Sequence, residues 1–141
     1  MLLFWQTNLY LSGMLSTPPV QKGSVWSRRV GGDVVHTPAI AHNMVYVTTS
    51  RGQVVALDTV TGTTRWSTDL GVEITADPTV AGDSVLIGTK DGAVFGLEAS
   101  TGAVRWEFKA ASRISGSPIV VGDTMYVVSF DGTLYAVTRA E

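Results

Sequence analysis

The chain has 141 residues, of which 45% are hydrophobic and 16% charged, so it is long enough to bury a core and too apolar for a disordered chain. Its formal net charge of −2 offers no broad basic surface, which argues against a nucleic-acid partner. The sequence contains no cysteine, which excludes disulfides, thiolate catalysis and cysteine-ligated zinc within it.

Residues 1–24 begin with an apolar stretch that does not have the pattern of a membrane span. Gln6, Thr7 and Asn8 interrupt it early, whereas a transmembrane helix needs about 20 consecutive apolar residues. The marks of a signal peptide, a basic start followed by an unbroken apolar run and a clear cleavage site, are not evident either. We interpret residues 1–24 as a degenerate segment, one interpretation being a worn copy of the repeat that follows.

From residue 26 onward the sequence repeats itself with a constant step of about 40 residues, the separation of Trp26 from Trp66. Thr61-Gly62 recurs as Thr101-Gly102, and Arg65-Trp66 recurs as Arg105-Trp106. A step kept through several residue types indicates one structural unit copied in tandem. The residues that keep the step are Trp26, Trp66 and Trp106, then Pro38, Pro78 and Pro118, and then Gly52, Gly92 and Gly132.

One copy of the repeat, residues 77–109, predicts four short strands. Residues 79–81 and 84–90 are rich in β-branched and apolar residues and flank Gly82-Asp83, a hairpin signal. Asp91-Gly92 predicts a tight turn before a third strand at 93–98, and a longer turn leads to a fourth strand at 103–109. The repeat step then predicts full repeats at about 37–69 and 77–109, a last repeat at 117–141 without its fourth strand, and a lone outer strand at 25–30.

Several of these strands are apolar at consecutive positions, as in Val85-Leu86-Ile87, so both faces of each sheet should be covered. The pattern predicts an all-β fold, a β-propeller whose blades are four antiparallel strands, with about three blades encoded here. Because propellers typically have about four to eight blades, either two chains pair into a six-bladed ring or a longer protein supplies the rest. We expect the chain to self-associate, with residues 25–30 as the outer strand that latches a terminal blade.

The stretch Ala56-Leu57-Asp58-Thr59-Val60-Thr61-Gly62-Thr63-Thr64-Arg65-Trp66 resembles the A-x-D-x-x-T-G-x-x-x-W motif of PQQ-like β-propeller repeats, the tryptophan-docking repeat. The next copy, at residues 96–106, matches with Gly for Ala and Glu for Asp. The family includes quinoprotein dehydrogenases and the outer-membrane assembly lipoprotein of the Bam complex. The resemblance covers residues 26–141.

The resemblance implies that each indole docks between neighbouring blades, where a buried Trp removes about 150–250 Å² from water. A carboxylate just before the Thr-Gly turn can cap the N–H groups of that turn. We therefore assign a structural docking role to Trp26, Trp66, Trp106, Asp58, Glu98, Gly62 and Gly102.

No catalytic or metal-binding constellation is predicted. His42 replaces a glycine of the sister repeats and is expected in a hairpin turn, and His36 lies in a linker without a converging ligand set. Asp91-Gly92 and Asp131-Gly132 lack the alternating carboxylates of calcium loops and are expected to be turns. The linkers differ most between copies, so their residues are the candidates for a contact face, the alternative being ordinary solvated charge. The candidate contact residues are His36, Glu73, Asp77 and Arg113.

We expect a non-catalytic scaffold that binds a protein or another ligand, with no cofactor. One alternative is a fragment of a quinoprotein dehydrogenase, which would bind pyrroloquinoline quinone (PQQ) and calcium; another is a propeller sensor domain of a larger bacterial signalling protein. The vicinal disulfide that some dehydrogenases of the family carry is impossible here, because cysteine is absent. The resemblance favours a periplasmic or extracytoplasmic location.

Overall fold

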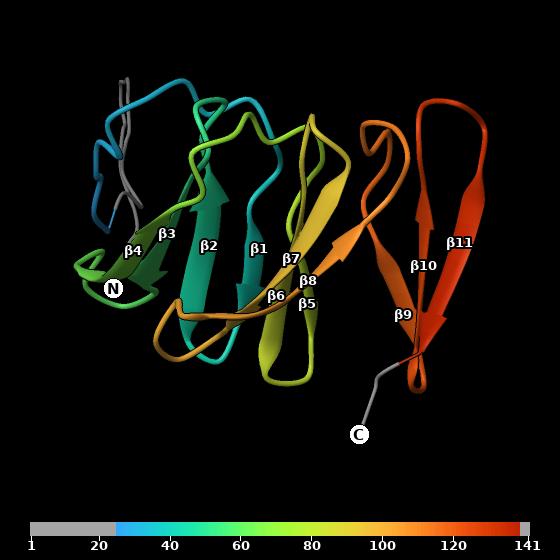
Figure 1. The fold of residues 1–141 in the computed structure, drawn as a ribbon. Helices are drawn as coiled ribbons and strands as arrows, with labels where there is room; N and C mark the ends of the chain where they lie inside the picture. The colour runs from blue at the N-terminus through green and yellow to red at the C-terminus, as the bar shows by residue number, and fades with distance from the viewer. Residues whose placement is uncertain (1–24, 139–141) are drawn as a thin grey trace, which may run out of the picture. The chain divides into compact units, whose positions relative to one another are not determined.

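The computed structural model describes residues 25–138, which divide into two compact units. The described part of the first unit is residues 25–29 together with Val60–Gly62, and that of the second is residues 30–59 and 63–138. The strands of the described chain lie in the second unit and form three antiparallel sheets (Figure 1). Within residues 25–138 the structure contains no helix with the length and hydropathy of a membrane span.

Each sheet is a meander in which consecutive strands are neighbours. The first sheet consists of β1 (Ala39–Ala41), β2 (Met44–Thr48), β3 (Gln53–Asp58) and β4 (Thr64–Asp69). The second consists of β5 (Thr79–Ala81), β6 (Ser84–Gly88), β7 (Ala93–Glu98) and β8 (Val104–Lys109). The third has β9 (Ile119–Val121), β10 (Thr124–Val128) and β11 (Leu134–Thr138).

The strand register keeps the repeat step of the sequence. Val45 pairs with Leu57 in the first sheet, and Val85 pairs with Leu97 in the second. In each of these sheets the pairing between the third and fourth strands shifts register, after Ala56 in the first sheet and after Gly96 in the second. The predicted unit of four antiparallel strands is therefore confirmed, and the register shift, which was not predicted, recurs in both complete sheets.

Three predicted strand limits differ from the structure, one of them only in that the fourth strand begins at Val104 instead of residue 103. The strand expected at 84–90 ends at Gly88, because Thr89 begins the following turn: its main-chain N–H donates to the Ala93 carbonyl and its hydroxyl contacts the Asp91 carboxylate. Residues 25–30, expected as an outer strand, have no regular secondary structure here. Their pairing with a terminal blade stays a prediction.

The first hairpin turn lies at His42 and Asn43, as predicted. Both residues have positive φ, 55° and 60°, which is the combination that a type I′ turn requires and that asparagine tolerates well. The imidazole Nε2 of His42 lies 2.8 Å from the carbonyl oxygen of Gly82, which is in the equivalent hairpin of the second sheet. The residue that replaces glycine here therefore links two hairpins one repeat apart.

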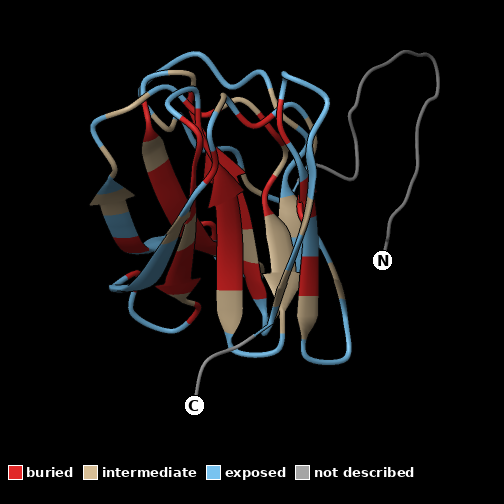
Figure 2. Cartoon of the chain, turned by 45° about the vertical axis from the view of Figure 1, so that its right-hand side comes forward, coloured by how far each residue is buried: buried red, intermediate tan, exposed pale blue. Residues whose placement is uncertain are grey.

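The sheets bury their facing sides against one another. The first core cluster joins the first and second sheets and includes Tyr46, Trp66, Ile87 and Leu97. The second cluster joins the second and third sheets through side chains such as Leu86, Val94, Met125 and Val127. Figure 2 shows the buried residues concentrated in the strands and the exposed residues in the loops. Both faces of the second sheet are thus covered, which explains its consecutive apolar residues.

The far face of the third sheet is not covered in the same way. Tyr126 is 39% exposed. The equivalent residues of the two preceding repeats, Leu86 and Tyr46, are 2% and 0% exposed. No strand of the described residues pairs with the second edge of β11, which is the place that β4 and β8 take in the other sheets. Among the described residues, this sheet therefore has a strand edge without a paired strand and a partly exposed apolar face.

Candidate functional site

The indole of Trp66 joins the first two sheets. Its Nε1–H donates to the Ala99 carbonyl at 2.8 Å, and its ring lies against Gly102. Gly102 has a φ of +79°, and a Cβ on it would collide with the Trp66 ring and the Thr68 hydroxyl. That hydroxyl donates to the Gly102 carbonyl at 2.6 Å. A glycine is therefore required here both by the backbone and by the indole.

The first unit contains the same contact one step earlier. The ring of Trp26 lies where a Cβ on Gly62 would be, and Gly62 also has a positive φ, +74°. The Arg28 Nε–H donates to the Gly62 carbonyl at 2.8 Å, which reproduces the bond that Thr68 makes to Gly102. Two successive tryptophans of the repeat therefore each meet the glycine of the next Thr-Gly pair along the chain.

Trp106 is placed differently. It is 37% exposed, against 8% for Trp66, and its ring lies over Gly96 on the neighbouring strand of its own sheet. The first sheet has Ala56 at the equivalent position, where a methyl group occupies this space. Because Gly96 has no Cβ, the Trp106 indole can lie in the space that the Ala56 methyl group occupies in the first sheet.

The two carboxylates at the end of the third strands each face an arginine of the fourth strand. Asp58 Oδ2 lies 3.2 Å from Arg65 Nη1, and Glu98 forms an ion pair with Arg105. Glu98 also accepts a hydrogen bond from the Ser100 hydroxyl, while its main-chain carbonyl accepts from the N–H of Gly102. The arginine partners were not predicted from the sequence, although the recurrence of Arg65 as Arg105 was a signal for them.

Two of the four candidate contact residues, His36 and Asp77, are brought together. The imidazole Nε2 of His36 lies 3.0 Å from the Ile74 carbonyl oxygen, and Nδ1 lies 3.6 Å from Asp77 Oδ1. The same carboxylate oxygen accepts the N–H of Thr37 at 2.9 Å. In the next linker the Thr75 hydroxyl donates to the carbonyl of Ile114, the residue equivalent to Ile74, at 2.7 Å, so each linker is tied to the next.

The other two candidates, Glu73 and Arg113, occupy equivalent positions in successive linkers. Glu73 lies 3.4 Å from Lys90 Nζ, and the Arg113 guanidinium carbon lies 5.1 Å from the centre of the Phe130 ring. We call the set of linker residues and their loop partners the linker rim. The linker rim consists of Asp33, Ser50, Glu73, Lys90, Arg113 and Phe130.

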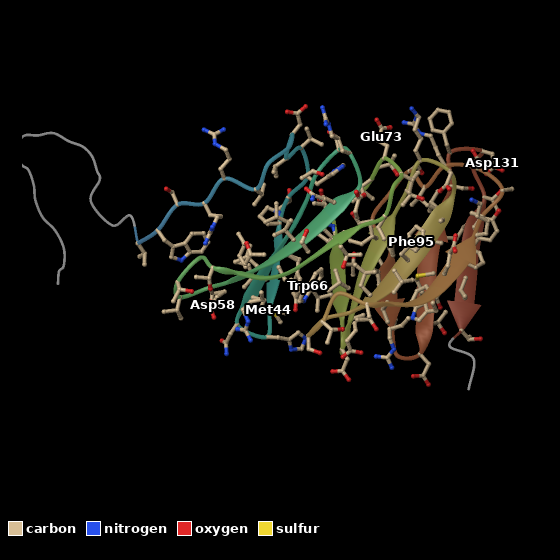
Figure 3. All side chains as sticks on the ribbon, turned by 60° about the vertical axis from the view of Figure 1, so that its left-hand side comes forward. Met44, Asp58, Trp66, Glu73, Phe95 and Asp131 are labelled. Atoms are coloured by element: carbon tan, nitrogen blue, oxygen red, sulfur yellow. The ribbon has the colours of Figure 1, made fainter. Side chains whose placement is uncertain are left out.

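The linker rim has a constant backbone and variable side chains. In all three linkers the linker carbonyl accepts an N–H from the following loop: Asp33 from Ser50 at 2.9 Å, Glu73 from Lys90 at 2.9 Å, and Arg113 from Phe130 at 2.7 Å. Figure 3 shows Glu73 and Asp131 at one end of the sheets, and Asp58 and Met44 at the other end. Since the backbone bond is the same in each copy, the side chains are not needed to make it.

The tight loops beside the rim are held by carboxylates. The Thr89 hydroxyl donates to Asp91 at 2.6 Å and, with Lys109 at 3.2 Å, lowers the pKa of Asp91. The Ser129 hydroxyl, joined by the N–H of Thr133, likewise lowers the pKa of Asp131. Both Asp-Gly pairs are turns, as predicted. Among residues 25–138 no group of three histidine or acidic side chains could hold a metal ion.

The second unit has more than one hollow. One, of about 360 Å³, is bounded by residues of the first and second sheets, among them His42, Met44 and Glu98. Another is an open groove of about 1460 Å³ between the second and third sheets, and Trp106, Phe108, Met125 and Val137 line part of it. Neither hollow gathers the four candidate contact residues.

A family model described as outer membrane protein assembly factor BamB matches the chain at residues 19–73 and again at residues 50–141. Together the two matches span the repeats and cover far more than half of the chain. The comparison with curated proteins gives no match.

Among solved structures, the chain is similar to BamB from Moraxella catarrhalis, with a TM-score of 0.73 and 25% identity over 80% of this chain. It is also similar to the quinohemoprotein alcohol dehydrogenase from Comamonas testosteroni, with a TM-score of 0.58 and 25% identity over 68% of this chain. The computationally designed Ika4 protein matches with a TM-score of 0.66 over 73% of this chain, and at 19% identity this likeness concerns the fold alone. The expected β-propeller blades are thereby confirmed.

The chain is shorter than the proteins it matches. It spans 37% of the BamB structure, 17% of the dehydrogenase and 64% of Ika4. The shared part is therefore the blade repeat, which by itself does not specify an activity.

Proposed function

We propose, from the premise that the chain belongs to the family of the outer membrane protein assembly factor BamB, that it is a non-catalytic scaffold that binds another protein. The observation that supports this is the linker rim. The same main-chain hydrogen bond forms there in each repeat, but the two residues that make it have different side chains in each repeat. Side chains that the repeat does not need for its own folding are available for recognition. The proposed contact face includes Glu73 and Arg113 of the linker rim, together with His36 and Asp77, which also join successive linkers.

Within the linker rim, Arg113 and Phe130 have the properties of a recognition centre. Phe130 is 69% exposed, and the guanidinium over its ring is worth only about 0.5–1 kcal/mol at such a site. The equivalent residues of the earlier loops are Ser50 and Lys90, so the blade does not require an aromatic side chain here. Aromatic residues and arginine are the residue types that dominate binding energy in protein interfaces.

A photocrosslinking experiment tests the scaffold proposal. A benzophenone-bearing phenylalanine replaces Phe130 in one variant and Asp83 in a matched control. Asp83 lies in the β5–β6 hairpin of the second sheet, at the end of the strands opposite the linker rim. With envelope proteins of the source cell as the probe, we expect a discrete adduct from position 130 that Arg113→Glu abolishes, and none from position 83. Equal labelling from both ends, or none from position 130, would contradict the proposal.

A second candidate, supported by the likeness to the quinohemoprotein alcohol dehydrogenase, is a fragment of a PQQ- and calcium-dependent dehydrogenase. The described residues do not fit a calcium site, since Asp58, Asp91 and Glu98 each face a cationic side chain and no three acidic groups converge. Incubation with PQQ and Ca²⁺, read by absorbance and dye reduction, distinguishes the two. Saturable binding with alcohol-dependent turnover would favour the enzyme.

A sensor domain of a larger signalling protein is the other candidate, and it would also bind through the linker rim.

Two properties accompany the scaffold proposal. We place the protein in the periplasm or another extracytoplasmic compartment, in keeping with the family description.

We also propose that the 141-residue chain self-associates through the open face of the third sheet, because exposed apolar faces and free strand edges favour association. Multi-angle light scattering tests this, and a monodisperse 15.0 kDa species would refute it.

A further inference from the structure

Arg113 is a cation of the linker rim that forms no ion pair within residues 25–138. At the equivalent place one repeat earlier, Glu73 Oε1 lies 3.4 Å from Lys90 Nζ. In the third repeat an arginine stands in place of the glutamate and Phe130 stands in place of the lysine. The guanidinium carbon therefore lies 5.1 Å from the centre of an aromatic ring instead of beside an opposite charge.

The carboxylate next to this pair is held by its own turn. Asp131 follows Phe130 directly, and its Oδ1 accepts the Ser129 hydroxyl at 2.5 Å and the Thr133 N–H at 3.1 Å. The Ser129 hydroxyl first, and then Thr133, lower the pKa of Asp131, so the carboxylate stays ionised within its loop. The side-chain interaction of Arg113 in the described part of the chain is the one with Phe130, so its N–H donors remain for a partner.

The exposure of Phe130 comes from its position in the loop between β10 and β11. Phe130 is 69% exposed. Its equivalent in the second sheet, Lys90, has a side chain that is 57% exposed, although that sheet packs against a neighbouring sheet on each face. The loop position is thus exposed even where both faces of the sheet are covered, and in the third sheet it presents an aromatic ring.

The chemistry of the pair indicates what it binds. A guanidinium presents its N–H groups as a planar fork that matches a carboxylate, and it can do so while it stacks on an aromatic face. An exposed aromatic ring adds apolar contact area of the kind that dominates binding energy in protein interfaces. We propose that Arg113 and Phe130 bind an acidic segment of the partner protein. An Asp or Glu side chain of that segment accepts hydrogen bonds from Arg113, and a neighbouring apolar side chain packs against the Phe130 ring.

The charges around the pair favour a protein carboxylate over a phosphate polymer. Glu73 and Asp131 lie at the same end of the sheets (Figure 3), and the chain has a formal net charge of −2. A nucleic acid carries a phosphate at every step and would meet these carboxylates repeatedly, whereas a protein segment needs only one acidic side chain at Arg113. The inference rests on the scaffold function proposed above, and it names the chemistry of the partner.

Fluorescence anisotropy of the purified chain with two labelled peptides tests the inference. One peptide is a tandem repeat of the sequence Asp-Leu-Gly-Ser, and the other has asparagine in place of each aspartate. We expect about tenfold tighter binding of the acidic peptide, because hydrogen bonds to a charged group are stronger than those to an amide. Arg113→Gln should remove this preference, while Arg113→Lys should keep part of it. Phe130→Ala should weaken the binding of both peptides, since both contain the leucine.

Arg65→Gln is the matched control. It removes the same charge from an exposed arginine whose partner, Asp58, lies at the opposite end of the sheets (Figure 3). The preference for the acidic peptide should stay within about twofold of that of the unmodified chain, as an exposed ion pair contributes little. Circular dichroism of each variant verifies that the sheets are retained.

The other outcomes separate this inference from the scaffold proposal. Equal binding of the two peptides, together with the crosslinked adduct from position 130, would overturn the acidic recognition and leave the scaffold proposal intact. Absence of that adduct would overturn both. Tighter binding of a single-stranded oligonucleotide or of vesicles with anionic phospholipid than of the acidic peptide would overturn the inference by assigning the pair to phosphate. Equal losses in Arg113→Gln and Arg65→Gln would overturn it by showing an effect of net charge.

Discussion

The indole N–H of Trp66 donates a hydrogen bond of 2.8 Å to the carbonyl oxygen of Ala99, which follows the third strand of the neighbouring sheet. The bond satisfies a buried donor and a buried acceptor at once, and the ring fills the space above Gly102. One side chain thus connects two copies of the repeat through polar and apolar contacts together.

Replacing Trp66 should destabilise the fold strongly. We expect Trp66→Ala to lower the free energy of unfolding by about 3–5 kcal/mol, because it leaves a cavity between the first and second sheets. Trp66→Phe should cost less, about 0.5–1.5 kcal/mol, because it removes the shorter of two hydrogen bonds to the Ala99 carbonyl and leaves the Tyr46 hydroxyl, at 3.4 Å, as the remaining donor. Urea unfolding measures both. Trp106→Ala is the control, and since that ring is 37% exposed its effect should be clearly smaller than that of Trp66→Ala.

Gly102→Ala should be worse than the same change at a comparable glycine. Gly102 and Gly122 both have positive φ, +79° and +62°, so alanine costs about 1–2 kcal/mol at each from backbone strain alone. Only at Gly102 does the added methyl group meet the Trp66 ring, whereas nothing lies within 4 Å at Gly122. Thermal unfolding should show the greater loss for Gly102→Ala, and equal losses for the two variants would contradict the docking role of the glycine.

Stability should depend on pH in the acid range through Asp91. Its pKa is lowered in the folded state by the Thr89 hydroxyl first and by Lys109. A depressed folded-state pKa contributes stability above the unfolded value of about 3.9, and that contribution is lost as the pH falls through the folded value. Thr89→Val should therefore raise the pKa of Asp91 in an NMR titration and weaken the pH dependence, while Thr89→Ser should preserve both. An unchanged titration in Thr89→Val would exclude the hydroxyl as the cause.

The link between successive linkers should depend on the acceptor at residue 77. Asp77→Ala removes the oxygen that accepts the Thr37 N–H, and we expect a loss of about 0.5–1.5 kcal/mol in the free energy of unfolding. Asp77→Asn retains an acceptor oxygen and should lose less. Hydrogen exchange at the Thr37 amide checks the mechanism, because its protection should fall in Asp77→Ala and persist in Asp77→Asn. Equal protection in both variants would indicate that the bond is not formed in solution.

The sequence by itself determined the repeat, its strands and its tight turns, since these depend on residues a few positions apart. The alternation of β-rich stretches with Gly-Asp and Asp-Gly pairs places β5 to β8, and the repeat step carries them to the other copies. The positive φ of His42 and Asn43 follows from their place in a two-residue hairpin. Local rules of this kind are repeated in each copy, which made them visible three times over.

Only the tertiary structure decided which residues of different copies meet. That Arg113 stacks on Phe130, that Trp106 lies on Gly96, and that Thr89 ends a strand expected to continue depend on side-chain geometry rather than on spacing. The physical reason is that contacts between copies require rotamers, distances and hydrogen-bond partners that a periodic pattern does not specify. The periodic sequence therefore reveals the repeat unit, but side-chain packing decides which residues of different copies contact each other.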